Sequence, residues 1–288
     1  MAAGLRLVLR ARAAARYPAP MDDDPEPRLR VGSVPYLVGR PLDAGLERVP
    51  GLVLRRAIPA ELVADLRSGA LDVALVSSIE LFRRPGYRWI GGLGVLGDGP
   101  VSSVQLFLRR PPAELERVAL DPASRTSAVL ARIVLAQAHG VRPEFVEVEP
   151  GADPREATAD AWLRIGDAAL RERLSEPDLE SLDPSLEWKR LTGLPFPFAA
   201  WIVRPGIDLA PWLAHFRASR DLGRREAGSF ADRAAEGLGL SRDDCRHYLL
   251  EECRFDADDR MAQALVRFRD LAAAIGQCEP DLTPTAIA

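Results

Sequence analysis

Short apolar runs alternate with amphipathic stretches along the chain from Arg28 onward. Runs typical of β-strands occupy residues 29–34, 52–57 and 72–76. The third run is nearly all apolar, as expected of a strand buried on both faces of a sheet. Residues 59–69 predict a helix, because Pro59 suits a first helical turn and Gly69 suits the position after the last. A shorter helix-like stretch follows the first run, and this alternation predicts a parallel sheet with right-handed crossovers.

A second unit of the same kind follows an extended segment at residues 101–110. Its expected elements are a strand at 117–121, a helix at 124–140, a strand at 144–149, and a strand that runs into a helix over 161–174. Residues 194–203 are apolar and aromatic, and their two prolines predict an extended crossing rather than a central strand. From about Leu209 onward the pattern predicts helices.

Two α/β units joined by two extended crossings predict an α/β fold, a two-lobed clam shell of mixed sheets with helices on both faces. We expect lobe 1 to comprise residues 29–103 and 200–288, because the C-terminal helices return to the first unit, and lobe 2 to comprise residues 104–199. Residues 1–27 are left out of the fold. Their Arg- and Ala-rich start resembles a transit peptide or a weak secretion signal, but we favour a start codon assigned too early, since Met21 opens an acidic segment.

The chain has 288 residues, of which 47% are hydrophobic, and a formal net charge of −4. This composition predicts folded domains with cores of their own. Because the charged residues are spread along the chain, nucleic-acid binding has little electrostatic support. No apolar run approaches the roughly 20 residues that a membrane helix needs. The three cysteines, without histidine at zinc-site spacing, predict reduced thiols in the cytoplasm and no metal site.

A literal GxGxxG pattern occupies residues 92–97. A dinucleotide site requires these glycines to open a helix, whereas here they continue through DGP into the run VSSVQLF. We therefore interpret the pattern as a glycine-rich turn before a crossing strand. His139, His215 and His247 lie far apart, within predicted helices or at their ends, which argues against a metal site or a catalytic triad.

The most informative polar segment is Ser124-Arg125-Thr126-Ser127, at the start of a helix that directly follows a strand. Free N–H groups and the positive end of the helix dipole at this position favour a carboxylate or phosphate ligand. The alternative is ordinary N-capping by Ser124 or Thr126. Capping needs one such residue, so four polar residues in a row favour anion binding.

Other polar residues also follow predicted strands. Hydroxyl groups recur at Ser33, at Ser77 and Ser78, and at Ser102 and Ser103, and each could also be a simple cap or turn residue. Open α/β sheets bind ligands at the carboxyl ends of their strands. Gly166 and Asp167 form another strand-to-helix turn, where Asp167 either orients a substrate hydroxyl, acts as acid or base, or stabilises the helix dipole. The aromatic residues Phe196, Phe198 and Trp201 could wall a ligand ring or pack in the core.

Six motifs together resemble a known family. VGSVPYLVGRPL, LDVALVSSIELFR, GPVSSVQLF, VALDPASRTSAVLARIVL, LRIGDAAL and TGLPFPFAAW occur in the order and spacing of the chorismate dehydratases of the futalosine route to menaquinone. The resemblance covers about residues 29–275. It implies a fold like the type II periplasmic binding proteins, and a cytoplasmic lyase that removes water from chorismate to give 3-[(1-carboxyvinyl)oxy]benzoate. It also implies that the enzyme uses neither a metal nor an organic cofactor.

The resemblance further implies which residues contact the substrate. Asp167 and Ser103 are the catalytic candidates, and the resemblance implies that the enolpyruvyl carboxylate of the substrate itself can act as the base. The four residues from Ser124 to Ser127 would hold one carboxylate, while Ser78, Ser102 and Ser103 place the other groups. The full set of expected substrate-binding residues is Ser33, Tyr36, Val38, Ser78, Ser102, Ser103, Ser124, Arg125, Thr126, Ser127, Gly166, Phe196 and Phe198.

One position departs from the family pattern. The family loop usually reads Tyr-Leu-Asn before its Pro-Leu pair, and Val38 stands at the place of that asparagine. The alternative function is therefore a non-catalytic or divergent binder of chorismate-like aromatic carboxylates. A ligand-sensing half of a regulator is disfavoured, because no helix-turn-helix segment precedes Arg28. The expected partner is a small-molecule substrate, and the choice between monomer and homodimer is open.

Overall fold

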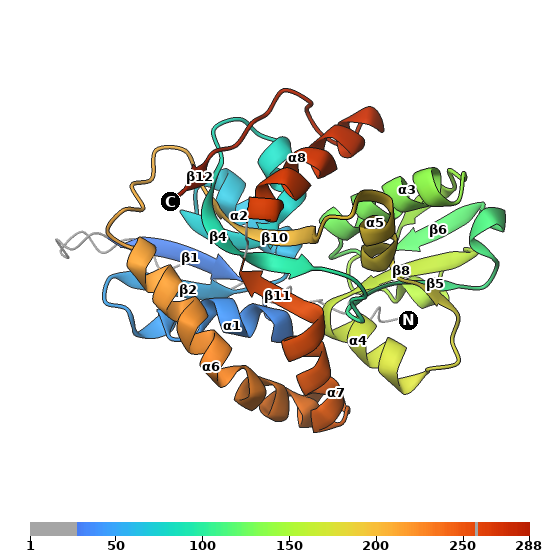
Figure 1. Ribbon diagram of the computed structural model, residues 1–288, viewed down its shortest axis with the longest axis horizontal. Coiled ribbons are helices and arrows are strands. Elements are labelled where there is room, and N and C mark those ends of the chain that lie inside the picture. The colour runs from blue at the N-terminus through green and yellow to red at the C-terminus, as the bar shows by residue number, and fades with distance from the viewer. Residues whose placement is uncertain (1–27, 257–258) are drawn as a thin grey trace, which may run out of the picture.

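The computed structural model describes residues 28–256 and 259–288. The expectation about the leader concerns residues 1–27 and lies outside this range. The described chain forms two β-sheets side by side, each covered by its own helices (Figure 1).

The larger sheet has the strand order β11-β4-β10-β3-β1-β2, with β12 paired to β4. Its strands are β1 (Leu29–Ser33), β2 (Leu52–Arg56), β3 (Val73–Ser77), β4 (Arg88–Gly97), β10 (Phe196–Val203), β11 (Cys253–Asp256) and β12 (Ala286–Ile287). Strand β1 pairs in parallel with both β2 and β3, which confirms the parallel unit predicted at the start of the chain. All five residues of β3 are buried, as its apolar run predicts.

The smaller sheet has the strand order β7-β6-β8-β5-β9. Its strands are β5 (Val104–Leu108), β6 (Arg117–Leu120), β7 (Glu144–Glu147), β8 (Ala161–Ile165) and β9 (Ser181–Leu182). Strand β6 pairs in parallel with β7 and β8, whereas β5 runs antiparallel to β8. Both sheets are therefore mixed, because the segments that cross between them join each sheet against the direction of its parallel strands.

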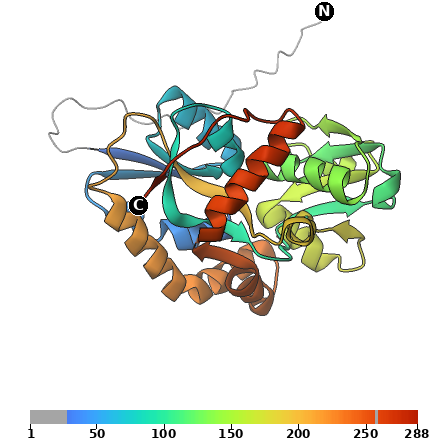
Figure 2. The same ribbon diagram turned by 45° about the horizontal axis from the view of Figure 1, so that its top comes forward.

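Helices cover both faces of the larger sheet. The helices next to it are α1 (Arg40–Asp43), α2 (Pro59–Ser68), α6 (Leu213–Leu238), α7 (Arg242–His247) and α8 (Asp259–Ala274). Figure 1 shows α1 and α6 on one side of the sheet and α8 on the other, and Figure 2 shows α8 running across the sheet toward the smaller lobe. The smaller sheet carries α3 (Thr126–Ala138), α4 (Gly166–Ser175) and α5 (Pro184–Thr192).

Two sequence-based expectations are wrong in the larger sheet. Residues 196–203 form a central strand, because β10 lies between β4 and β3. Pro197 is tolerated there because it lies where the pairing with β4 shifts register, and because the pairing with β3 starts only at Ala199. The glycine-rich pattern at residues 92–97 is part of strand β4 rather than a turn.

The C-terminal third is less helical than predicted. After α7 the chain makes a single π-turn, Tyr248–Glu252, and then enters β11 at the edge of the larger sheet. The helical expectation is correct for α6, α7 and α8 but misses this edge strand and β12. The π-turn contacts the segment that connects the two sheets, through Tyr248 and Glu252.

Candidate active site

A cavity lies between the two lobes, with an empty volume of about 670 Å³ that includes its open mouth. Ligand sites usually occupy roughly 300–1,000 Å³. The N-terminal ends of α3 and α4 contribute to one wall, and strands β4 and β10 contribute to the opposite wall. Eight of the residues expected to bind substrate line this cavity: Tyr36, Val38, Ser103, Arg125, Thr126, Ser127, Gly166 and Phe198.

The start of α3 is the most strongly cationic part of the cavity wall. Arg125 occupies the N-cap position, and no side chain caps this helix end. Within the described part of the chain, the half-buried guanidinium of Arg125 has no hydrogen-bond or ion-pair partner. Uncapped N–H groups beside a free guanidinium favour a carboxylate, which an arginine can bind through two parallel hydrogen bonds. The structure therefore shows no side-chain capping by Ser124 or Thr126 at this helix end, and anion binding stays a prediction.

Thr126 connects the two lobes beside this helix end. Its Oγ1 accepts a hydrogen bond of 3.2 Å from the backbone N–H of Ile79, which follows strand β3 of the other lobe. Ser124 lies directly before Arg125, and its buried Oγ has no protein partner among the described residues.

The loop after β1 forms another part of the wall. Val38, within the short 3₁₀ turn Leu37–Gly39, presents only methyl groups to the cavity. The ring of Tyr36 packs against Gly166 at the start of α4. Burial raises the pKa of the Tyr36 phenol, and the nearby carboxylates of Asp121 and Asp167 raise it further. Tyr36 therefore stays protonated and can donate a hydrogen bond to a ligand oxygen.

Asp167 lies in the first turn of α4, as expected of a residue that stabilises the helix dipole, and its side chain is not part of the cavity lining. Its Oδ1 accepts a hydrogen bond of 3.0 Å from the backbone N–H of Leu37. Its side chain lines a separate surface depression that also contains Arg40 and Arg233. Burial raises the pKa of this carboxyl group. Asp167 thus holds the loop that carries Tyr36 and Val38. Its effect on the cavity is indirect, through the position of that loop.

The remaining expected residues do not line the cavity, and Ser102 lines a separate depression. Ser33 is fully buried and its Oγ has no protein partner among the described residues. Ser78 donates a 2.5 Å hydrogen bond to the carbonyl of Pro197, and Ser102 Oγ donates to Glu252 over 2.8 Å. Phe196 packs edge-on against Trp188 and Phe268 in an aromatic core between the lobes.

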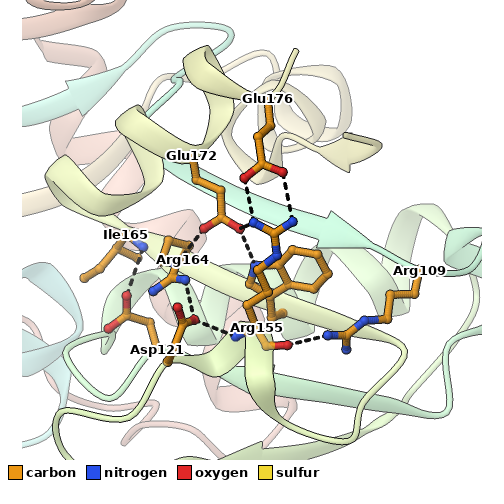
Figure 3. Close-up of polar contacts among 9 residues, drawn as sticks. Arg109, Asp121, Arg155, Arg164, Ile165, Glu172 and Glu176 are labelled. Carbon is orange, nitrogen blue, oxygen red and sulfur yellow. Dashed lines mark hydrogen bonds and ion pairs between the residues drawn. The ribbon is translucent and has the colours of Figure 1, made fainter. Parts of the chain in front are cut away.

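A polar network supports the wall formed by Ile165 and Gly166 (Figure 3). The backbone N–H of Ile165 donates to the carboxylate of Asp121 over 3.2 Å. Arg164, the residue before Ile165 on β8, donates to Glu172 on α4 over 2.7 Å. Arg155 continues the network by a double hydrogen bond to Glu176. These contacts fix the angle between β8 and α4, and with it the position of the turn at Gly166.

Two cavity residues, Tyr248 and Cys253, were missed by the sequence analysis. The Tyr248 hydroxyl donates a hydrogen bond of 2.8 Å to Ser103 Oγ. Burial raises the pKa of both the Tyr248 phenol and the Cys253 thiol, so both groups stay protonated. Their sequence neighbourhood predicts a surface helix, and nothing local in it points to a cleft about 145 residues earlier in the chain.

Two carboxylates hold the crossing segment that leads to Ser103. Glu252 accepts the N–H of Ser102 over 2.6 Å, and Asp183 accepts the N–H of Val101 over 2.6 Å. Asp183 also caps α5 by accepting the N–H groups of Ser185 and Leu186. The crossing is thereby tied to both lobes.

The buried Asp183 predicts a pH dependence of stability. Burial raises its pKa to about 6, above the value of about 3.9 that we expect in the unfolded chain. The folded state therefore binds the proton more tightly, and the free energy of unfolding should fall as pH rises from about 4 to about 6. Urea unfolding of wild type and Asp183→Asn across this range checks the effect. The variant should lose part of the slope, and an unchanged slope would refute the assignment to Asp183.

The chain is similar to known proteins over most of its length. A family model described as menaquinone biosynthesis matches residues 29–274. The chain is 32% identical over 245 residues to the chorismate dehydratase of Thermus thermophilus, which covers 75% of this chain and 87% of the relative. The chain belongs to the chorismate dehydratase family. A second family member, from Campylobacter jejuni, is 27% identical over 175 residues, which is 58% of this chain and 64% of the relative.

The fold of this chorismate dehydratase family member is similar to that of several solved structures. The alkanesulfonate-binding protein SsuA of Xanthomonas axonopodis matches with a TM-score of 0.65 at 17% identity, over 88% of this chain and 94% of that one. A Candida albicans protein described as having the generic periplasmic binding protein fold matches with a TM-score of 0.58 at 12% identity, over 87% of this chain and 90% of that one. The predicted periplasmic-binding-protein-like fold is confirmed.

Among the described residues, every helix is too short or too polar to span a bilayer. No group of three or more His, Cys, Asp or Glu side chains among them is placed to hold a metal ion.

Proposed function

We propose that this protein removes water from chorismate to give 3-[(1-carboxyvinyl)oxy]benzoate in menaquinone biosynthesis. The observation that carries the proposal is the unpartnered guanidinium of Arg125 at the uncapped start of α3, inside a cavity between the lobes. Membership of the chorismate dehydratase family supports the same substrate. A dianionic substrate suits a cavity that offers a cation, helix N–H groups and hydroxyl donors.

The reaction needs a proton to leave ring C3 and a hydroxyl group to leave ring C4. The C3–H electron pair forms the new ring double bond, the C4–O pair leaves with the oxygen, and the proton and hydroxide leave as water. The C3 proton is vinylogous to the ring carboxylate. Donors such as Arg125 that hold this carboxylate therefore stabilise the charge that develops as the proton leaves. No oxidant or reductant is required.

The base is proposed to be the enolpyruvyl carboxylate of the substrate. Among the described residues that line the cavity there is no aspartate, glutamate or histidine. Holding the substrate carboxylate close to the C3 proton would then supply much of the acceleration. We propose Asp167 as a positioning residue for this arrangement, because its carboxylate holds the backbone of Leu37 beside Tyr36.

The partner and the location follow from the same proposal. The substrate is a small molecule made and consumed by biosynthetic enzymes, and Cys245, Cys253 and Cys278 are free thiols, so we infer a cytoplasmic protein. Monomer and homodimer are both open predictions. Light scattering of the purified protein distinguishes them.

The direct test of the proposed function is incubation of the purified protein with chorismate, followed by mass spectrometry. Formation of a product lighter by one water, in amounts that grow with enzyme concentration, is the expected result. Saturable chorismate binding without that product would refute catalysis. It would instead favour the alternative of a non-catalytic binder, which the methyl groups of Val38 in the cavity make worth testing.

Val38 also gives a prediction of its own. The Val38→Asn variant should turn chorismate over at least as fast as wild type, because an amide at this half-buried position adds a donor and an acceptor to the cavity. Steady-state kinetics of the two proteins checks it. Val38→Leu serves as the apolar control and should not gain activity. A large loss in Val38→Asn alone would show that the loop acts through a different geometry.

A further inference from the structure

Tyr248 and Ser103 form a hydrogen-bonded pair in the cavity wall that the reaction described so far does not use. Tyr248 begins the π-turn between α7 and β11, and its side chain is 1% exposed. Ser103 ends the crossing from the larger sheet to β5 and is 6% exposed. The Tyr248 hydroxyl donates to Ser103 Oγ over 2.8 Å, and both residues line the cavity. Single π-turns inserted next to helices are frequent at functional sites.

The direction of this hydrogen bond decides where the serine proton can go. A serine hydroxyl has one proton and can accept up to two hydrogen bonds. Because Ser103 Oγ accepts the proton of Tyr248, its own proton needs another acceptor. No other hydrogen bond of Ser103 Oγ is found among the residues that the structure describes. The Ser103 proton is therefore available to a ligand in the cavity.

The surroundings keep this arrangement in place. Burial raises the pKa of the Tyr248 phenol, so it remains a donor over the range in which enzymes work. The Cys253 thiol lines the same cavity. The hydrogen bond from Tyr248 polarises the Ser103 hydroxyl in this buried site. Glu252, at the end of the same π-turn, holds both the N–H and the hydroxyl of Ser102. One short turn thus fixes the backbone and the hydroxyl of the crossing segment.

We propose that Tyr248 is a positioning residue that makes Ser103 a hydrogen-bond donor to the departing hydroxyl group of the substrate. This rests on the proposed dehydration of chorismate. Ser103 donates to the C4 oxygen while the C4–O bond breaks, and it keeps its own proton when water leaves. The hydrogen bond strengthens as negative charge develops on the departing oxygen, so it acts mainly in the transition state.

A double-mutant cycle tests the proposal with chorismate as the probe. Tyr248→Phe should lower kcat about tenfold with KM within about twofold of wild type, because a transition-state interaction is lost. Ser103→Ala should lower kcat further. If Tyr248 acts through Ser103, the double variant should have the kcat of Ser103→Ala alone. A multiplied loss in the double variant, or a wild-type kcat in Tyr248→Phe, would overturn the proposal.

Two further variants control for the general loss of a buried hydroxyl and for misfolding of Tyr248→Phe. Tyr87→Phe removes the hydroxyl of another buried tyrosine, whose side chain lines a different depression of the surface, and should leave kcat and KM unchanged. Ser103→Cys keeps a weaker donor in place and tests the role of Ser103 even if Tyr248→Phe fails to fold. Its kcat should fall about tenfold, and a wild-type kcat would overturn the proposal. Wild-type protein that forms no product would instead refute the proposed function itself.

Discussion

Replacing Arg125 by alanine is expected to lower kcat/KM for chorismate about 100-fold, which corresponds to the loss of a charged hydrogen bond worth about 1.5–3 kcal/mol. The guanidinium lines the cavity and has no carboxylate partner in the described part of the protein, so its charge is available to the substrate. If it holds the ring carboxylate, both substrate binding and transition-state stabilisation should weaken. Initial rates of product formation, followed by mass spectrometry over a range of chorismate concentrations, give kcat and KM.

The Arg125→Lys variant separates charge from geometry. Lysine keeps the positive charge but cannot form two parallel hydrogen bonds with a carboxylate. Its kcat/KM should therefore lie between those of wild type and Arg125→Ala. The matched control is Arg142→Ala, which removes an exposed arginine beyond the opposite end of α3 and should change neither parameter. A kcat/KM for Arg125→Ala within twofold of wild type would refute the role of Arg125 in substrate binding.

The position of Arg125 could be predicted because it depends on local sequence. A buried strand followed at once by a polar turn and a long apolar helix places the helix start at a sheet edge, whichever fold surrounds it. The start of α3 lies two residues inside the expected segment, at Thr126. The same local logic predicted the turn from β8 into α4 at Gly166.

Contacts between distant segments could not be predicted in this way. The two prolines near Phe196 argued against a central strand, since sequence alone does not show that Pro197 falls at a shift of register. The choice between the two roles expected for Phe196, ligand wall or core residue, could not be made from the sequence for a related reason. Its partners Trp188 and Phe268 come from α5 and α8, and only the packing of both helices against β10 shows that Phe196 belongs to the core.

Tyr248 shows the same limit in the active site. A π-turn has no distinctive hydrophobic period, so residues 242–252 have the pattern of an ordinary amphipathic helix. The contact with Ser103 spans 145 residues of sequence. The direction of the hydrogen bond depends on which groups surround the two hydroxyls, and that is a property of the folded chain. For Asp167 the local pattern predicted the turn into α4 correctly. It could not predict that the side chain lies in the depression beside Arg40 rather than in the cavity.

Replacing Gly166 by alanine should lower kcat/KM for chorismate about tenfold or more, since a small displacement of a residue that contacts the substrate, here Tyr36, is costly for catalysis. Gly166 has φ +64°, and a Cβ there would lie 3.0 Å from the ring of Tyr36. Its N–H also donates to the carbonyl of Ser103 over 2.8 Å. The added methyl group must therefore move Tyr36, the crossing segment, or both.

The control for this prediction separates backbone strain from the displacement of Tyr36. Gly140, just after α3, has φ +69°, but a Cβ there would meet nothing within 4 Å. Each alanine should lower the free energy of unfolding by about 1–2 kcal/mol through left-handed backbone strain. Chemical unfolding should show at least this loss for both variants, whereas steady-state kinetics should show a loss for Gly166→Ala alone. Wild-type kinetics in Gly166→Ala would mean that the contact between Tyr36 and Gly166 does not shape the substrate site.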